Sequence, residues 1–262
     1  MAARRPIPVY LEVTPKRTFA AAVDWPGWCR SGRTRDEALE ALVAFGPRYA
    51  KVVGKRAGFA PPADFAGLKV SQRLKGGPTT EFGAPQVAPG GDRQPLGEVE
   101  LKREITLLRA AWRAFDAALK RHAGVELRKG PRGGGRDQQR MASHVFDAEQ
   151  GYLRQLGARP PKAASEATDA DRRALRKAVV AALSARARDE PLDNPSGAKK
   201  RWLPRFYVRR AAWHALDHAW EIEDRAQPWA GAAPKIRGGG NSVGRSGPST
   251  WKSASGSGRP CS

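Results

Sequence analysis

Residues 7–53 first alternate between apolar and polar positions and then change to a helical period. Period-two alternation is typical of a strand with one buried face, whereas apolar residues at steps of three and four are typical of an amphipathic helix. The pattern predicts strands over 7–13 and 18–23, a turn over 25–28 and a helix over 34–45. The expected core of this part is Val9, Leu11, Phe19, Ala21, Val23, Leu39 and Leu42.

The start of the predicted helix is marked by Thr34-Arg35-Asp36-Glu37. In such a capping box, the Thr34 hydroxyl accepts from the backbone N–H of Glu37, and the Glu37 carboxylate reaches back to the backbone N–H of Thr34. We therefore expect a well-defined first turn.

Glycine and proline interrupt the pattern over residues 54–97, and regular helical periodicity begins at Glu98. The breakers predict a linker over 61–97 with at most a short strand at 68–74. Apolar stripes then predict a first helix of about 25 residues. Three more helices are expected: one around 141–152 that ends near Gly157, one over 169–188 and one over 204–225.

These elements predict an α+β chain in two parts. Residues 1–60 form a small α+β module, and residues 98–225 form an antiparallel four-helix bundle, which is the usual solution for four amphipathic helices joined by breakers. Residues 226–262 are rich in glycine and serine and lack apolar periodicity. Such a tail buries too little apolar surface to offset its ordering entropy, so we expect it to be disordered.

The chain has 262 residues and a net charge of +21, and its basic excess is spread along it. The excess is +6 over residues 1–60, +9 over 98–225 and +5 over 226–262. A nucleic-acid binder usually concentrates charge on one element, so this distribution favours compositional background over a polyanion-binding surface, although the second stays open.

The expected compartment follows from two features that the sequence lacks, a membrane-spanning apolar run and a signal-peptide pattern. No apolar run approaches the roughly 18 residues of a membrane span, and the N-terminal residues do not resemble a signal peptide. Cys29 and Cys261 are the two cysteines and allow at most one disulfide. We expect a cytoplasmic protein without a disulfide scaffold. Cys29 is either a reactive thiol, activated by Arg30 or Arg33, or an inert, partly buried one, and the second is favoured.

Three of the four histidines form the candidate site. His214 and His218 are one helical turn apart, a spacing that lets two imidazoles share a metal ion. His144 lies beside the apolar stripe of the second bundle helix. If that helix faces the fourth, three imidazoles converge and leave coordination positions open, as in a catalytic metal site. The alternative is that the three side chains only form hydrogen bonds or face solvent.

Charged residues share the helix face of His214. Asp217 or Glu221 could accept an imidazole N–H, and Arg210 could hold an anionic group such as a substrate carboxylate. The favoured alternative is that charged residues of this region form intrahelical or interhelical salt bridges among themselves. The residues in question are Arg209, Arg210, Asp217, Glu221, Glu223, Asp224 and Arg225. The tryptophans Trp112, Trp213 and Trp220 are expected to pack in the core.

Residues 98–225 resemble the DinB-like superfamily, which includes thiol transferases dependent on mycothiol or bacillithiol and maleylpyruvate isomerases. The resemblance rests on His144 within Ser143-His144-Val145-Phe146-Asp147 and on the pair His214 and His218. It implies a four-helix bundle in which these three histidines bind a divalent ion such as nickel or zinc. Fold and metal carry over better than substrate does.

Residues 18–39 are similar to the strand, Pro-Gly loop and capped helix of HicB-like antitoxin domains. The similarity covers about 45 residues of the chain, and no separate DNA-binding motif follows it. We interpret this segment as an isolated module that could mediate homodimerisation.

Two functions follow. The first is a metal-dependent S-transferase or related hydrolase, whose partners would be a low-molecular-weight thiol of the mycothiol type and an electrophilic small molecule. No proton-transfer residue is evident from the sequence. The second is a non-enzymatic, antitoxin-like regulatory protein whose basic surface contacts nucleic acid.

Overall fold

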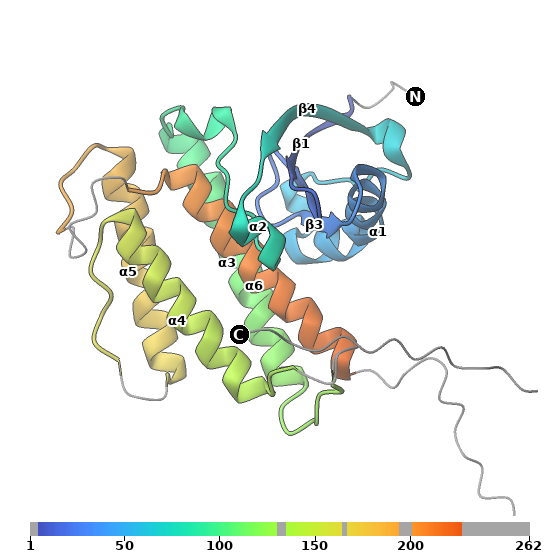
Figure 1. Cartoon of the computed structure of the whole chain (residues 1–262). Helices are drawn as coiled ribbons and strands as arrows, with labels where there is room; N and C mark the ends of the chain where they lie inside the picture. The colour runs from blue at the N-terminus through green and yellow to red at the C-terminus, as the bar shows by residue number, and fades with distance from the viewer. Residues whose placement is uncertain (1–4, 130–134, 164–166, 194–200, 227–262) are drawn as a thin grey trace, which may run out of the picture. The chain divides into compact units, whose positions relative to one another are not determined.

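The computed structural model describes residues 5–129, 135–163, 167–193 and 201–226. Figure 1 shows the order of the elements along the chain. The N-terminal part contains β1 (Ile7–Val13), β2 (Thr18–Ala22), β3 (Cys29–Gly32), α1 (Arg35–Val53), β4 (Leu68–Lys75), the short helix α2 (Pro78–Phe82) and the 3-10 turns η1 (Lys55–Ala57), η2 (Phe65–Gly67) and η3 (Gly90–Arg93). The helical part contains α3 (Glu98–Arg121), α4 (Gln138–Leu156), α5 (Asp169–Ala187) and α6 (Pro204–Ala226).

The four strands form one mixed sheet in the order β3-β2-β1-β4. β1 pairs antiparallel with β2 and parallel with β4, and β2 pairs antiparallel with β3. The sequence predicted β1 and β2 and placed a short strand where β4 lies, but it predicted a turn before β3 and no third strand. β4 follows the expected module boundary at residue 60, yet it completes the sheet of that module.

The two faces of the sheet bury different sets of side chains. Val9 and Leu11 of β1 lie in the large core cluster with α1, whereas Phe19 and Ala21 lie on the opposite face with Tyr10 and Trp213. The expectation that Phe19 and Ala21 share one core with Val9 and Leu11 is therefore wrong. The cause is register, because Tyr10 stands opposite Ala21 in the β1–β2 pair, and partners in register point to the same face.

Helix α1 begins where the capping motif predicts. The backbone N–H of Glu37 donates to the Thr34 hydroxyl at 3.1 Å, while the Glu37 carboxylate accepts from the backbone N–H of Arg33 at 2.8 Å. The reciprocal bond thus reaches Arg33 instead of Thr34. The helix continues past the predicted end at residue 45, through Pro47, and ends at Gly54.

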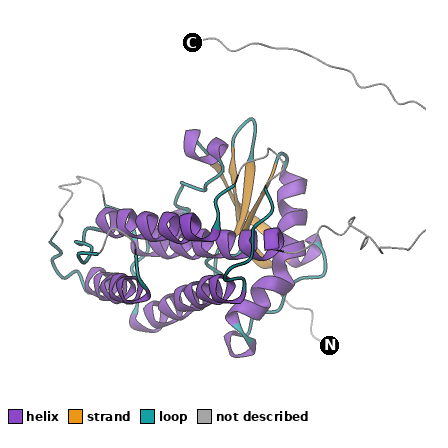
Figure 2. Ribbon diagram, turned by 90° about the horizontal axis from the view of Figure 1, so that it is seen from below, coloured by secondary structure: helices purple, strands orange, loops and turns teal. Residues whose placement is uncertain are grey.

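The helical part matches the predicted four-helix bundle closely. α3 has 24 residues, α4 ends at Gly157 in a left-handed conformation, and α5 and α6 begin at the predicted residues. In Figure 1, α3 and α6 lie between the sheet with α1 on one side and α4 with α5 on the other. Figure 2 shows the strands gathered together, apart from these long helices.

The loop between β2 and β3 fits closely against α6. Gly27 has a φ of 93°, a left-handed conformation that glycine adopts without a steric penalty. A Cβ atom at this position would lie 2.9 Å from Leu216 Cδ1 and 3.2 Å from Ala212 Cβ. The Pro-Gly loop of the N-terminal part therefore packs directly on the helix that carries two of the three candidate histidines.

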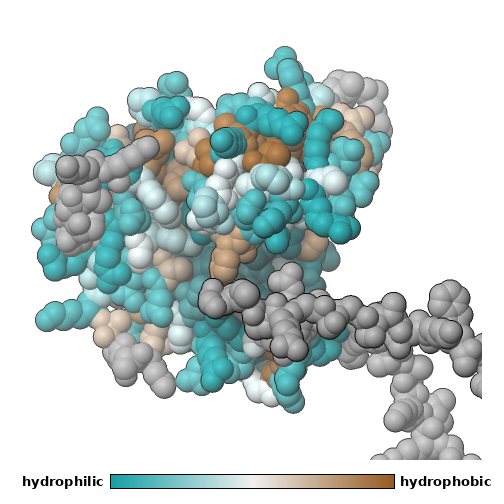
Figure 3. Space-filling model, viewed as in Figure 1, coloured by the Kyte–Doolittle hydropathy of each residue, from teal (hydrophilic) through white to brown (hydrophobic). Residues whose placement is uncertain are grey.

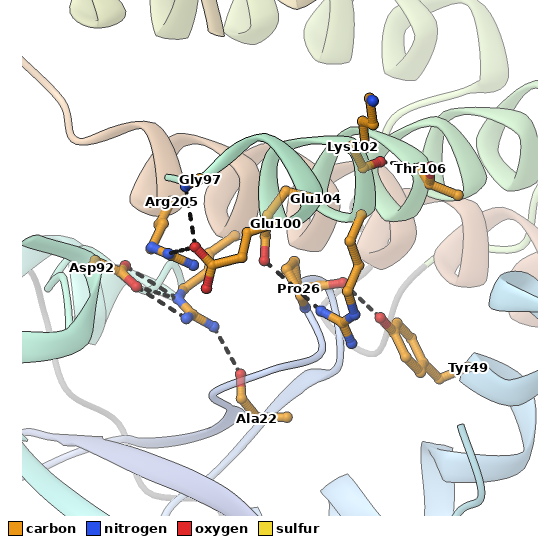
Figure 4. A network of polar contacts seen from close by, with 12 residues as sticks. Ala22, Pro26, Tyr49, Asp92, Gly97, Glu100, Lys102, Glu104, Thr106 and Arg205 are labelled. Atoms are coloured by element: carbon orange, nitrogen blue, oxygen red, sulfur yellow. Dashed lines mark hydrogen bonds and ion pairs between the residues drawn. The ribbon is translucent and has the colours of Figure 1, made fainter. Parts of the chain in front are cut away.

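A network of polar contacts joins α6 to the N-terminal part (Figure 4). Arg209 donates to both carboxylate oxygens of Asp92 in η3, at 3.0 and 3.1 Å, and to the carbonyl of Ala22 in β2 at 2.9 Å. The side chains of Asp92 and Arg209 are buried, so this ion pair is shielded from solvent. The network fixes the N-terminal half of α6 against the sheet.

None of the described helices is long and apolar enough to cross a membrane. The space-filling view in Figure 3 shows hydrophilic side chains over most of one face of the molecule. Apart from Ala226, the last residue of α6, the tail expected to be disordered lies outside the described residues.

Candidate metal centre

The helices α4 and α6 bring His144, His214 and His218 together. One ligand nitrogen from each imidazole lies within 4.8 Å of the others. The Nε2 atoms of His214 and His144 are 3.2 Å apart, and the ring centroids of the three pairs are 4.7 to 5.0 Å apart. The sequence predicted this convergence only on the condition that the second and fourth bundle helices face each other.

The local sequence explains how the three rings meet. His214 and His218 are four residues apart on α6, so they lie one above the other on the same face. Val145 and Met141 hold α4 in the core, and His144 lies at the margin of that buried stripe. The neighbouring Tyr152, two turns further along α4, places its ring centroid 5.7 Å from that of His214.

Burial keeps the imidazoles of His144 and His214 neutral. His214 and His218 are 6% and 8% exposed, while His144 is half-buried. Desolvation and the nearby charge of Arg136 lower the pKa of His144 to about 4. Desolvation, followed by the neighbouring His218 and His144, lowers the pKa of His214 well below its usual value. Both rings are therefore unprotonated at neutral pH, which is the form that ligates a metal ion.

The carboxylate of Glu221 orients one of the rings. Its Oε2 atom lies 2.9 Å from Nδ1 of His218, which leaves Nε2 of that ring to face the other histidines. The hydrogen bond from His218, with Arg225 at 2.8 Å from the other carboxylate oxygen, lowers the pKa of Glu221. A carboxylate that accepts the distal N–H of a histidine is the usual support of a histidine ligand.

The other two residues predicted to support the site make no hydrogen bond to an imidazole of the triad among the described residues. Asp217 accepts a hydrogen bond from Arg30 of β3 at 2.8 Å and makes no contact with an imidazole of the triad in the described structure. Arg210 donates to the carbonyl of Pro85 at 2.7 Å and lies over the rings of Trp213 and Tyr152, at 4.9 and 5.6 Å from their centroids.

Of the residues expected to pair among themselves, one pair does so in the described structure, and the other salt bridges link α6 to segments distant in the sequence. Glu223 and Asp224 pair with Arg48 of α1 at 2.7 and 2.8 Å, and Glu221 pairs with Arg225 within α6. Both readings of this face thus apply, to different residues. Glu221 contacts His218, whereas its acidic neighbours pair α6 with α1.

Residues outside the triad also have defined places. Cys29 is buried on the sheet, and desolvation raises the pKa of its thiol, so the inert interpretation holds. Trp112, Trp213 and Trp220 are buried, as predicted. Tyr152, which the sequence placed only within the predicted second bundle helix, also lies beside the triad. Its offset of eight residues from His144 was the available signal, because eight residues span about two helical turns.

The donor set suits a divalent transition metal. Two ligands at about 2.05 Å from a tetrahedrally coordinated ion are separated by about 3.3 Å, which is close to the observed 3.2 Å. At this distance one ring can also donate an N–H to the other. His214 Nδ1 is buried and has no hydrogen-bond partner among the described residues. Three histidine ligands would leave at least one coordination position for water or substrate.

Comparisons with protein-family models, with curated proteins and with solved structures gave no match to this chain. The structure itself therefore carries the functional argument: a sheet with one helix, followed by a helical region that holds a cluster of three histidines that could bind a metal ion.

Proposed function

We propose that the protein binds a divalent transition-metal ion, nickel or zinc, through His144, His214 and His218. The observation that carries this proposal is the convergence of three imidazole nitrogens within 4.8 Å, two of them on rings kept neutral by burial. Packing alone explains the cluster poorly, because buried ring nitrogens need partners and Nδ1 of His214 is buried without one among the described residues.

We further propose that the bundle is DinB-like and that the site serves a thiol S-transferase or a related hydrolase. The order of the four helices and the positions of the histidines on the second and fourth support this assignment. When bound, a divalent ion with an open position lowers the pKa of a coordinated thiol or water. The substrates would be a low-molecular-weight thiol of the mycothiol type and an electrophilic small molecule.

Three side chains of the protein would prepare this site. Glu221 orients the ring of His218 through the contact at 2.9 Å. Arg210 and Tyr152 lie beside His214 and would present a guanidinium and a phenol to an anionic group of the substrate. Burial raises the pKa of Tyr152, so its hydroxyl keeps its proton and can donate it in a hydrogen bond.

We also propose that the N-terminal part is a HicB-like module. The Pro-Gly loop, the capped helix and a sheet that buries both faces support this assignment. In the enzyme it would serve partner contact or homodimerisation in the cytoplasm, and it would not contribute a metal ligand.

Metal analysis of protein purified without a histidine tag tests the proposal directly. We expect stoichiometric nickel or zinc, and titration calorimetry on the metal-free protein should show one site. His144→Ala, His214→Ala and His218→Ala should each lower the affinity far more than His122→Ala, because His122 lies outside the cluster.

Two results would overturn the metal site. The first is a folded protein that binds neither ion at neutral pH. The second is an affinity that does not change when His144 is replaced. Circular dichroism on each variant separates loss of the site from loss of the fold, and an S-transfer assay then tests the enzyme separately from the metal.

A further inference from the structure

A hollow between α3 and α5 is lined almost entirely by positive charge. Its volume is about 350 Å³. The residues that line it are Arg109, Trp112, Arg113, Arg173, Arg176, Lys177 and Val180. Five of these seven side chains are cationic and none is acidic, although the basic excess of the sequence is spread evenly along the chain. Folding therefore concentrates charge that the sequence distributes.

Most of these cations lack a counter-charge. Arg176 is held by both carboxylate oxygens of Asp116, at 2.6 and 3.0 Å. Arg109, Arg113, Arg173 and Lys177 are exposed, and the described part of the chain provides none of them with a carboxylate partner. Like charges in one hollow repel each other, and an anion bound among them would relieve this repulsion.

The four unpaired cations form two parallel rows. Arg109 and Arg113 are four residues apart on α3, and Arg173 and Lys177 are four residues apart on α5. Each pair is thus separated by about 6 Å along its helix. Two rows on neighbouring helices present charges on both sides of a bound chain, which suits a repeating anion better than a single one.

The positive charge continues beyond this hollow. Arg113 also lines a second hollow of about 660 Å³ between α1, α3 and α6, where Lys51 adds another cation without a partner among the described residues. Arg48, Arg121, Glu223 and Asp224 also line this hollow, and they form ion pairs with one another. We call the unpaired residues the cationic track: Lys51, Arg109, Arg113, Arg173 and Lys177.

We propose that the cationic track binds the phosphodiester backbone of a nucleic acid. Arg and Lys contacts to phosphates supply affinity without reading sequence. The track extends over two hollows joined at Arg113, which is longer than a small anion requires. Trp112 is only 4% exposed, so it offers no ring face for base stacking, and the contacts that the track would make are to phosphates, which carry no sequence information. This site is separate from the histidine cluster and does not rest on the proposed metal function.

Fluorescence anisotropy with a labelled single-stranded oligonucleotide of mixed sequence, at a series of salt concentrations, tests the proposal. The variant is Arg109→Ala with Arg173→Ala. The matched control is Lys69→Ala with Arg73→Ala, which removes two exposed charges from the edge strand β4 and leaves the same net charge. We expect the variant to reduce the slope of log affinity against log salt by about 1.4, because each lost contact to a single strand removes about 0.7. The control should leave the slope unchanged.

Three results would overturn the proposal: no binding at about 50 mM salt, where phosphate contacts are strong; equal losses in the variant and the control; or tighter binding to vesicles of phosphatidylcholine and phosphatidylserine than to the oligonucleotide. Circular dichroism confirms that both double variants fold. His214→Ala should bind the oligonucleotide like the unchanged protein, so failure of the metal site and failure of the track can be told apart.

Discussion

The two halves of α6 carry buried polar clusters of opposite character. In the N-terminal half, Arg209 is saturated by Asp92 and by the carbonyl of Ala22. In the C-terminal half, His214 and His218 face His144, and Glu221 is the carboxylate that hydrogen-bonds to the cluster among the described residues. One helix thus presents a paired set of charges to the sheet and a set of neutral bases to α4.

The contrast between the two clusters distinguishes a structural role from a ligand-binding one. A buried ion pair whose donors and acceptors are satisfied by other protein atoms leaves no free group for a ligand. In the histidine cluster, ring nitrogens converge and could bind a ligand, and Nδ1 of His214 has no hydrogen-bond partner among the described residues, which costs stability. The candidate site is therefore identified by how far its polar atoms are hydrogen-bonded to other protein atoms, and less by burial. Substitutions in the two clusters should consequently have different effects.

The largest effect is expected at the paired cluster. Arg209→Met should destabilise the protein by about 3–5 kcal/mol, because it leaves the Asp92 carboxylate buried without its partner. Burial already raises the pKa of Asp92, an effect that Arg209 partly offsets. Urea unfolding measures the change in the free energy of unfolding.

The control for this variant is Arg205→Ala on the same helix. Arg205 is 16% exposed, donates to the carbonyls of Gln94 and Pro95, and pairs with Glu100, whose side chain is 55% exposed. Its removal leaves no buried charge without a partner, so it should cost less than the removal of Arg209. Equal effects of the two substitutions would show that the Arg209 pair is no more structural than a surface one.

The next largest effect is a dependence of stability on pH, and it comes from the carboxyl of Glu104, which lies near the Arg209–Asp92 pair. Burial raises the pKa of Glu104 to about 7, against the opposing influence of Arg209, Arg103 and Arg205. Because the folded pKa exceeds the unfolded value of about 4.3, the folded state holds the proton longer, and stability falls as pH rises from about 4.5 to about 7.

Glu104→Gln should remove this loss. At about pH 8 it should stabilise the protein by on the order of 3 kcal/mol, and at about pH 4 it should have little effect. Unfolding free energies of both proteins across the range provide the test, and parallel pH profiles would contradict it. Glu149, whose pKa burial also raises to about 7, contributes in the same direction to both proteins.

The third effect is confined to the histidine cluster. Nickel or zinc at about 100 times its dissociation constant should stabilise the protein by about 2.7 kcal/mol, because the ion binds the folded state. His214→Ala should abolish this stabilisation, whereas Arg205→Ala, at the other end of α6, should retain it. Thermal unfolding with and without metal measures the shift, and an equal shift in the His214 variant would show that the ion binds elsewhere.

Elements with a strong local pattern were predictable from the sequence. The periodic apolar residues of α3 to α6 and the breakers between them gave the helix order, and the capping box marked the start of α1. β3 was missed because its four residues, Cys29–Gly32, carry no alternation, and only its pairing with β2 makes it a strand. The sheet face of Phe19 was predicted wrongly for the same reason, because the register of a strand depends on the strand with which it pairs.

Part of the candidate site could also be predicted, because that part depends on a local pattern. His214 and His218 are local to one helix, so their spacing was informative. Their meeting with His144 depends on how two helices pack, and the resemblance to a family supplied that expectation. The partners of Arg209 and Asp217 are 117 and 187 residues away in the chain, and no short-range pattern encodes such contacts.

The smallest expected effect distinguishes the two carboxylates that the sequence could not separate. Glu221→Gln should lower metal affinity by about 10- to 100-fold, the usual cost of losing the carboxylate that orients a histidine ligand. Asp217→Asn should leave the affinity unchanged, because Asp217 is engaged by Arg30 at 2.8 Å instead of by an imidazole. Titration calorimetry on the two variants measures both constants, and circular dichroism confirms their folds. The two substitutions are isosteric and remove the same charge three and seven residues from His214, so general electrostatics would weaken metal binding in both. A loss in Asp217→Asn as large as that in Glu221→Gln would therefore show that the acidic face acts through its field, and that the contact between Glu221 and His218 does not position the ligand.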